Sequence, residues 1–317
     1  MKLIVSDLSN IEGRVLAWVA GEKWKVEAFR AYDRGEGPDL YNITATSIIG
    51  GDPWKVKKKD RNVFGKVPDL ACGYGGGAGA FDTFEKGYGV VMSDHWDTIK
   101  QNIARKHITT AKKNYTEWGA ARAPDVEQAL WVARETVKQA WRSRHPATVK
   151  LWRAVEDAVR DAIGSPGGTF KVGKYLKIGV RTRARRKYLL VMLPSGRYLC
   201  YFDPKITSDG TISYMGMGTE NEGSTTKAWF RLFTYGGKLV ENIVQAIARD
   251  VLYGSMPAAE EAGYAIVLHV HDELVTEADD ELTVDGLSDI LSAPVVWAPG
   301  LPLAAAGFEA HRYKKED

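Results

Sequence analysis

Two short apolar segments near opposite ends of this 317-residue chain each lead into acidic residues. Residues 2–6 are expected to form a buried strand that ends at Asp7, and residues 264–275 are expected to form a hairpin with His271 and Asp272 at its turn. Carboxylates at the tips of neighbouring strands are typical of Mg²⁺ sites, because this ion takes few protein oxygens and completes its shell with water and phosphates. Taken alone, two distant acids favour a simpler interpretation as solvated turn residues.

The pattern between these segments changes from helix to strand and back, which indicates an α+β chain. The composition, with 44% apolar and 26% charged residues, excludes a disordered chain and a collagen. The longest stretch without charge, 290–308, holds three prolines and two glycines, which are too many breakers for a membrane-spanning helix. The expected helices are 11–20, 96–114, 124–163 with a break at Pro146, and 239–253, and the expected strands are 188–193 and 197–202, followed by a loop or weak strand over 203–224.

The two cysteines, Cys72 and Cys200, are too few for a disulfide framework or a zinc site. We expect both to be reduced packing residues, which fits a cytoplasmic location. The start of the chain is apolar too briefly for a signal peptide.

The net charge is only +3, but the charges are unevenly distributed. Residues 250–311 contain twelve acids and no Lys or Arg, whereas basic runs occur at 55–61, 100–113 and 181–187. This distribution fits a polyanion that is bound through metal ions at one place and through cations elsewhere. Solvated helix faces are the alternative explanation for any single run.

Four segments together resemble the motifs of family A DNA polymerases, the group of bacterial DNA polymerase I and many phage enzymes. Residues 7–17 resemble the first palm motif, and residues 270–273 match the third. Lys66, with Tyr74 and a glycine eight and nine residues later, matches the fingers-helix motif. Residues 234–250 look like the helix before the third motif. The order and spacing also agree, so the resemblance covers essentially the whole chain.

The resemblance implies a polymerase right hand of class α+β, with an antiparallel palm sheet and mostly helical fingers. The implied domains are a palm part at 1–30, fingers at 31–230 with a β-rich insertion near 169–220, and a second palm part at 231–317. The implied reaction is the template-directed addition of deoxynucleotides to a primer 3′ end, with primer–template DNA and deoxynucleoside triphosphates as partners. For a phage protein, the implied location is the cytoplasm of the bacterial host.

The resemblance also implies roles for the palm residues. Asp7, Asp272 and the Leu8 carbonyl would hold two Mg²⁺ ions for phosphoryl transfer. Glu12 would close the pocket beneath the sugar and exclude a 2′-hydroxyl. His271 would contact the primer terminus. Further DNA contacts are implied for Gln245, in the minor groove, and for Arg14, for which a structural partner is the alternative.

In the fingers, Lys66 would contact the triphosphate and is the third implied catalytic residue. Leu70 and Tyr74 follow at helical spacing, so the three side chains are expected to share one helix face that meets the nucleotide. Leu70 replaces the aromatic residue that is common in the family at this position, so some stacking would be lost.

The family places an Arg four residues before the fingers Lys, but here Arg61 lies five residues before Lys66. On a regular α-helix five residues turn about 500°, which would put Arg61 about 140° from the Lys66 face. Pro68 also lies within the motif. We expect a π-bulge near residues 64–65 to absorb the extra residue and return Arg61 to the nucleotide. A helix that begins near Pro68 is the alternative.

In the family, an exonuclease or its remnant and a thumb precede the first motif. Six residues before Asp7 leave no room for a thumb or an exonuclease, so either the chain is a fragment or a separate N-terminal polypeptide with a thumb is expected to complete the enzyme. Residues 2–6 would then have an exposed strand edge. Two other functions stay open, namely a non-catalytic nucleic-acid-binding half of a split or degenerate polymerase, and a single-subunit RNA polymerase.

Overall fold

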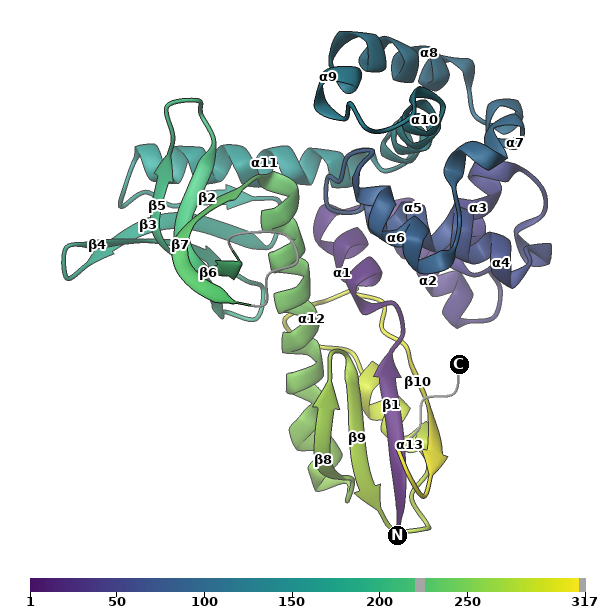
Figure 1. Cartoon of the computed structure of the whole chain (residues 1–317). Coiled ribbons are helices and arrows are strands. Elements are labelled where there is room, and N and C mark those ends of the chain that lie inside the picture. The colour runs from purple at the N-terminus through teal and green to yellow at the C-terminus, as the bar shows by residue number, and fades with distance from the viewer. Residues whose placement is uncertain (220–225, 314–317) are drawn as a thin grey trace. The chain divides into compact units, whose positions relative to one another are not determined.

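The computed structural model describes residues 1–219 and 226–313 (Figure 1). Its contacts divide the chain into two compact units. Unit 1 consists of residues 1–20, 154–235 and the chain from Leu239 onward. Unit 2 consists of residues 21–153 and 236–238. These boundaries differ from the predicted ones, because the β-rich segment that was expected within fingers 31–230 belongs to unit 1.

A four-stranded antiparallel sheet in unit 1 carries both predicted acids. Its strand order is β10-β1-β9-β8, so β1 has a partner on each side. The expectation of an exposed edge at residues 2–6 is therefore wrong, since the C-terminal strand β10 covers that side of β1. Gly307 permits the close approach of β10, because a Cβ there would overlap the carbonyl oxygen of Val5. The strands are β1 (Lys2–Leu8), β8 (Ala265–Val270), β9 (Glu273–Ala278) and β10 (Ala305–Ala310).

Helices position the two ends of this sheet. The predicted helix at 11–20 is confirmed as α1 (Ile11–Ala20), which follows β1 directly. The predicted helix at 239–253 is confirmed within the longer α12 (Gly236–Glu261), which leads into the β8–β9 hairpin. Helix α13 (Val284–Ser292) lies against β1, where the hydroxyls of Ser288 and Ser6 are 2.8 Å apart.

A second antiparallel sheet of unit 1 has six strands in the order β2-β3-β4-β5-β6-β7. The two strands predicted at 188–193 and 197–202 are confirmed as the paired strands β4 and β5. Of the loop or weak strand expected over 203–224, the strand is present as β6, and residues 220–224 lie outside the described residues. Gly216 and Gly218 allow this strand, because they leave room for Leu232 and Phe230. The strands are β2 (Phe170–Val172), β3 (Leu176–Arg183), β4 (Arg186–Met192), β5 (Tyr198–Ile206), β6 (Ile212–Thr219) and β7 (Lys227–Thr234).

Side-chain contacts tie the six-stranded sheet to the rest of unit 1. Trp18 of α1 stacks on Tyr175, which lies between β2 and β3, with ring centroids 4.0 Å apart. Arg197, just before β5, donates to Asp250 of α12 at 2.6 Å. These contacts explain why the β-rich segment joins unit 1.

Unit 2 is helical, as the apolar spacing predicted for most of it. Its buried side chains include Phe29, Phe81, Met92 and Ile99. Cys72 is also buried, whereas Cys200 is exposed on β5, so only the first is the expected packing residue. The helices are α2 (Lys23–Asp33), α3 (Leu40–Ile49), α4 (Lys58–Asp60), α5 (Val67–Cys72), α6 (Ala80–Tyr88), α7 (Trp96–Asn102), α8 (Arg105–Asn114), α9 (Ala120–Arg122), α10 (Gln128–Arg144) and the start of α11 (Pro146–Gly164), with π segments η2 (Arg61–Lys66) and η4 (Tyr115–Gly119) and short 3₁₀ turns η1 (Pro53–Lys55) and η3 (Met92–His95).

None of the helices in the described part of the chain combines the length and the apolarity that a membrane crossing requires.

Candidate active site

Pairing between β1 and β9 brings the two predicted acids to neighbouring strand ends. Asp7 lies opposite Glu273 in the register, and the amide of Leu8 donates to the carbonyl of Asp272 at 3.0 Å. His271 occupies the turn before β9 with a φ of 55°, the left-handed conformation of a tight turn. The strand tips predicted from the sequence therefore meet in the fold.

A cavity of about 580 Å³ gathers four of the predicted site residues from three separate elements. Glu12 comes from the first turn of α1, Gln245 from α12, and His271 and Asp272 from the β8–β9 turn. Arg249 also lines this cavity, one helical turn after Gln245, and its guanidinium lies 4.5 Å from the centre of the Tyr253 ring. The i+4 spacing from Gln245 was the signal that could have identified Arg249.

Asp7 lines a second cavity, of about 540 Å³, together with Glu273 and strand β10. Glu273 is buried, and its carboxylate accepts a hydrogen bond from the Tyr313 hydroxyl at 2.8 Å. The sequence placed Glu273 in the third motif without a role of its own, and it gave no sign of Tyr313, because their contact joins this motif to residues near the end of the chain.

The ligands at the strand tips fit a magnesium site that is completed by water and phosphates, and do not fit a metal site made of protein ligands alone. Within residues 1–219 and 226–313, no three His, Cys, Asp or Glu side chains gather as a metal-binding cluster. Asp7, Asp272 and the Leu8 carbonyl offer hard oxygen ligands at adjacent strand ends. Mg²⁺ suits such a set, because it keeps several waters and also binds substrate phosphates.

Arg14 is buried, with only 1% of its surface exposed, and its Nε donates to the Ser9 carbonyl at 2.7 Å. The implied DNA contact of Arg14 does not fit this burial. The structural alternative does, because the hydrogen bond holds the turn between β1 and α1.

Gln245 is exposed in the cavity, whereas its neighbour Asn242 donates to the Tyr201 hydroxyl of β5 at 3.1 Å. Asn242 thus serves packing between α12 and the six-stranded sheet.

The expected π-bulge is present in unit 2, because residues 61–66 form the π-helix η2 between α4 and α5. The amide of Val67 donates to the carbonyl of Asn62, five residues earlier. The alternative, a helix that begins near Pro68, is present as well, because the α-helix α5 begins at Val67 with Pro68 in its first turn and directly continues η2. Gly65 is required in η2, because a Cβ would overlap the carbonyl oxygen of Tyr41 in α3.

Arg61 makes a bidentate contact with Asp39, from Nε at 3.1 Å and from a terminal nitrogen at 2.9 Å. Asp39 also caps α3, where it accepts from the amides of Tyr41 and Asn42. The π segment therefore brings Arg61 to a carboxylate of this chain, and its contact with a triphosphate stays a prediction.

Lys66 ends η2, and its ammonium lies 5.9 Å from the centre of the Tyr88 ring. Leu70 follows on α5 and is half-buried, but α5 ends at Cys72. The expectation of a single helix face is therefore wrong for Tyr74, which lies in the turn beyond the helix. The glycines at 73, 75 and 76 explain the early end.

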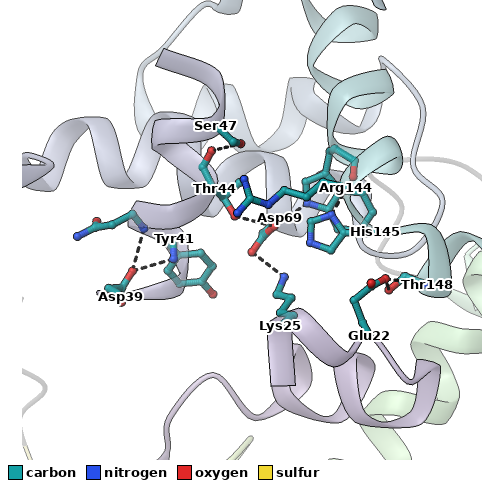
Figure 2. A network of polar contacts seen from close by, with 12 residues as sticks. Glu22, Lys25, Asp39, Tyr41, Thr44, Ser47, Asp69, Arg144, His145 and Thr148 are labelled. Atoms are coloured by element: carbon teal, nitrogen blue, oxygen red, sulfur yellow. Dashed lines mark hydrogen bonds and ion pairs between the residues drawn. The ribbon is translucent and has the colours of Figure 1, made fainter. Parts of the chain in front are cut away.

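Asp69 anchors α5 from within the same motif, and sequence reasoning missed it. Its carboxylate accepts from Lys25 at 3.0 Å and from the Trp141 indole at 2.6 Å, and Figure 2 shows Lys25 pointing at Asp69. Burial acts to raise the pKa of Asp69, but the charges of Lys25 and His145 and these hydrogen bonds outweigh it, so the pKa lies below its usual value. An acid between Lys66 and Leu70 was the available signal.

No protein-family model matches the chain. A DNA polymerase from Bacillus phage SP02 is 35% identical over 318 aligned residues, which cover 98% of this chain and 41% of that protein. The chain is a homologue of a phage DNA polymerase. The POL domain of Pol1 from M. smegmatis, solved in complex with DNA primer-template and dNTP, has a similar fold, with a TM-score of 0.50, 15% sequence identity, and coverage of 98% of this chain and 40% of that chain.

These comparisons confirm the resemblance to a phage DNA polymerase and the α+β fold of a polymerase domain. This polymerase homologue spans less than half the length of the phage protein that it matches.

Proposed function

We propose that this chain catalyses template-directed DNA synthesis, in which deoxynucleotides are added to a primer 3′ end. The observation that carries the proposal is the 3.0 Å hydrogen bond between the Leu8 amide and the Asp272 carbonyl, which sets the strand ends of Asp7 and Asp272 side by side. The names of the phage relative and of the Pol1 structure support the same reaction, with primer–template DNA and deoxynucleoside triphosphates as the partners.

In this proposal Asp7, Asp272 and the Leu8 carbonyl hold two Mg²⁺ ions. When bound there, Mg²⁺ would supply charge neutralisation for the triphosphate and the pyrophosphate and would make the primer hydroxyl more acidic. Both carboxylates would have to be held in fixed positions to bind the ions. The pairing of β1 with β9 supplies that rigidity.

The other residues of the cavity that Asp272 lines bind and orient the substrates. Glu12 closes the space beneath the sugar, and His271 contacts the primer terminus. Gln245 lies on the exposed side of α12, where it can reach acceptor atoms that all base pairs share in the minor groove. Such contacts allow DNA of any sequence to bind.

In unit 2 the proposal assigns the triphosphate to Lys66, with Leu70 and Tyr74 beside the base pair that forms. Arg61 joins Lys66 only by exchanging the Asp39 carboxylate for phosphate oxygens. Since phosphate offers the same bidentate acceptor geometry as a carboxylate, this exchange keeps the Arg61 hydrogen bonds.

The proposal includes a separate N-terminal polypeptide with a thumb as a partner. Synthesis by this chain alone is then expected to be distributive and to rise when that polypeptide is added. For a phage enzyme the site of action is the host cytoplasm.

Primer extension with Mg²⁺ and deoxynucleotides tests the proposal, with Asp272→Asn compared to the unchanged chain. The matched control is Asp280→Asn, since Asp280 is an acid whose side chain is 81% exposed. We expect extension to fall below detection in Asp272→Asn and to persist in Asp280→Asn. Extension that survives in Asp272→Asn refutes the proposed site. Primer–template binding by the unchanged chain without extension, also after the N-terminal polypeptide is added, supports the non-catalytic half instead.

A further inference from the structure

One face of the six-stranded sheet is buried and the other is not. Ile178, Val180, Leu189 and Val191 point to the buried face, each at most 1% exposed. Residues one position away along the same strands must point to the opposite face, because successive side chains of a strand alternate. That opposite face is here called the open face.

The open face is aromatic and apolar, which is unusual for a surface in contact with water. Tyr198, Met217, Trp229 and Phe233 are 52%, 56%, 55% and 65% exposed, respectively. Single exposed apolar residues are common, but contiguous ones mark a binding surface.

The strand register shows that these side chains are contiguous. Tyr188, Phe202, Met215 and Arg231 lie opposite one another on β4, β5, β6 and β7 and form one row across the sheet. The next row contains the pair Met217 and Trp229. Ring centroids are 5.4 Å apart for Tyr188 and Phe202, and 6.1 Å apart for Phe202 and Trp229.

Basic side chains surround the aromatic rows. Arg181 of β3 lies opposite Tyr188, and the Arg186 guanidinium lies 5.6 Å from the centre of the Phe202 ring. Among the described residues of this surface, Asp203 is paired with both Arg231 and Lys205. The open face is therefore positively charged as well as aromatic.

A hollow of about 330 Å³ lies at one side of this face. Lys177 and Arg181 line it together with Leu190, Met192 and Tyr198. Arg181 is held in place there, because its guanidinium donates to the Gly168 carbonyl at 2.8 Å. The hollow thus combines two cations with an aromatic ring and apolar walls.

We propose that the open face binds single-stranded DNA, with bases stacked on Trp229, Phe202 and Tyr198 and phosphates near Arg181, Lys177 and Arg186. Stacking needs bases whose faces are free, which a single strand offers and a duplex does not. The cations favour a polyanion over an apolar protein surface. This site goes beyond the proposed function, because binding here requires neither Asp272 nor Mg²⁺ nor a nucleotide.

The test is fluorescence anisotropy with a labelled oligothymidine strand and a labelled blunt duplex, without metal or nucleotide. All variants are made in the Asp272→Asn chain, so that the result does not depend on polymerase activity. Trp229→Ala is compared with Trp54→Ala, a matched control, since Trp54 of unit 2 is 61% exposed. We expect Trp229→Ala to weaken single-strand binding about tenfold, and Trp54→Ala to leave it unchanged.

A charge variant tests the phosphate interactions separately. Replacing Lys177 and Arg181 by Gln should lower the slope of log affinity against log salt by about 0.7 for each phosphate that is no longer neutralised. Circular dichroism verifies folding, and Tyr198→Ala on β5 replaces Trp229→Ala if that variant does not fold.

If Trp229→Ala and Trp54→Ala bind single-stranded DNA equally well, the proposal is overturned. The open face would then be a surface for a protein partner. An equal loss of duplex and single-strand binding also overturns it, because general phosphate attraction then explains the affinity.

Discussion

The ammonium of Lys25 lies 3.0 Å from the carboxylate of Asp69, and the two side chains are only 7% and 8% exposed. Lys25 belongs to α2, whereas Asp69 lies on α5 between Lys66 and Leu70. This buried ion pair therefore fixes the helix that carries the proposed nucleotide contacts to the body of unit 2.

Removal of one partner should be costly. Lys25→Met leaves the Asp69 carboxylate buried without its counter-charge, and we expect a loss of about 3–5 kcal/mol in the free energy of unfolding in urea. The double variant Lys25→Met, Asp69→Leu should recover much of this loss, since neither charge of this pair is then buried. Lys86→Met is the control, because the Lys86–Asp82 pair is exposed and should contribute at most about 1 kcal/mol. A loss of similar size in both single variants would refute the special role of the buried pair.

His145 should make the stability of unit 2 depend on pH. Burial and the nearby Lys25 lower the pKa of His145 to about 3, from 6.5 when unfolded, and its Nδ1 hydrogen bonds to the Trp141 carbonyl. The folded state thus binds fewer protons than the unfolded state between these values, so stability is present above pH 6.5 and lost as the pH falls. Between pH 7.5 and 5.5 we expect a loss of about 1 kcal/mol. Asp69 does not titrate in this window, because its folded pKa is lowered from 3.8.

The measurement is urea unfolding at both pH values, for the unchanged chain and for His145→Gln. The variant should lose the pH dependence whatever its absolute stability. The same dependence in both chains would show that other groups cause it.

Gly65→Ala should disturb the π segment. The added Cβ meets the Tyr41 backbone of α3, so η2 must move away from that helix, at about 1–3 kcal/mol of unfolding free energy. Gly87→Ala in α6 is the control, since nothing lies within 4 Å of a Cβ there and alanine favours the helix. Thermal unfolding followed by circular dichroism gives both values. If the two variants are equally stable, η2 does not pack against α3 as described.

Glu12→Ala should relax the choice of sugar in the proposed reaction. Glu12 lines the cavity with Asp272, and without its side chain a 2′-hydroxyl has space beneath the sugar. We expect the ratio of ribonucleotide to deoxynucleotide incorporation to rise about tenfold in primer extension. An unchanged ratio would remove Glu12 from sugar discrimination. A preference for ribonucleotides in the unchanged chain would support the RNA polymerase alternative.

Several parts of the fold and site could be predicted because they depend on short stretches of sequence. The hairpin with His271 and Asp272 at its turn follows from strand patterning, and helix 11–20 follows from apolar spacing. The π segment followed from the resemblance, because this chain has one more residue between Arg61 and Lys66 than the family's motif, and Pro68 lies nearby.

Long-range contacts decided the rest. Only the fold shows that β10 covers β1, that Arg14 is buried and that Arg61 pairs with Asp39. The local sequence pattern of a segment does not indicate which other segment it will contact. The same holds for the six-stranded sheet, whose glycine-rich β6 looks like a loop until β5 and β7 supply its hydrogen bonds. The sequence by itself determined the local elements and the residues of the proposed chemistry, and the tertiary structure decided which of them meet, because strand pairing and burial are properties of distant segments together.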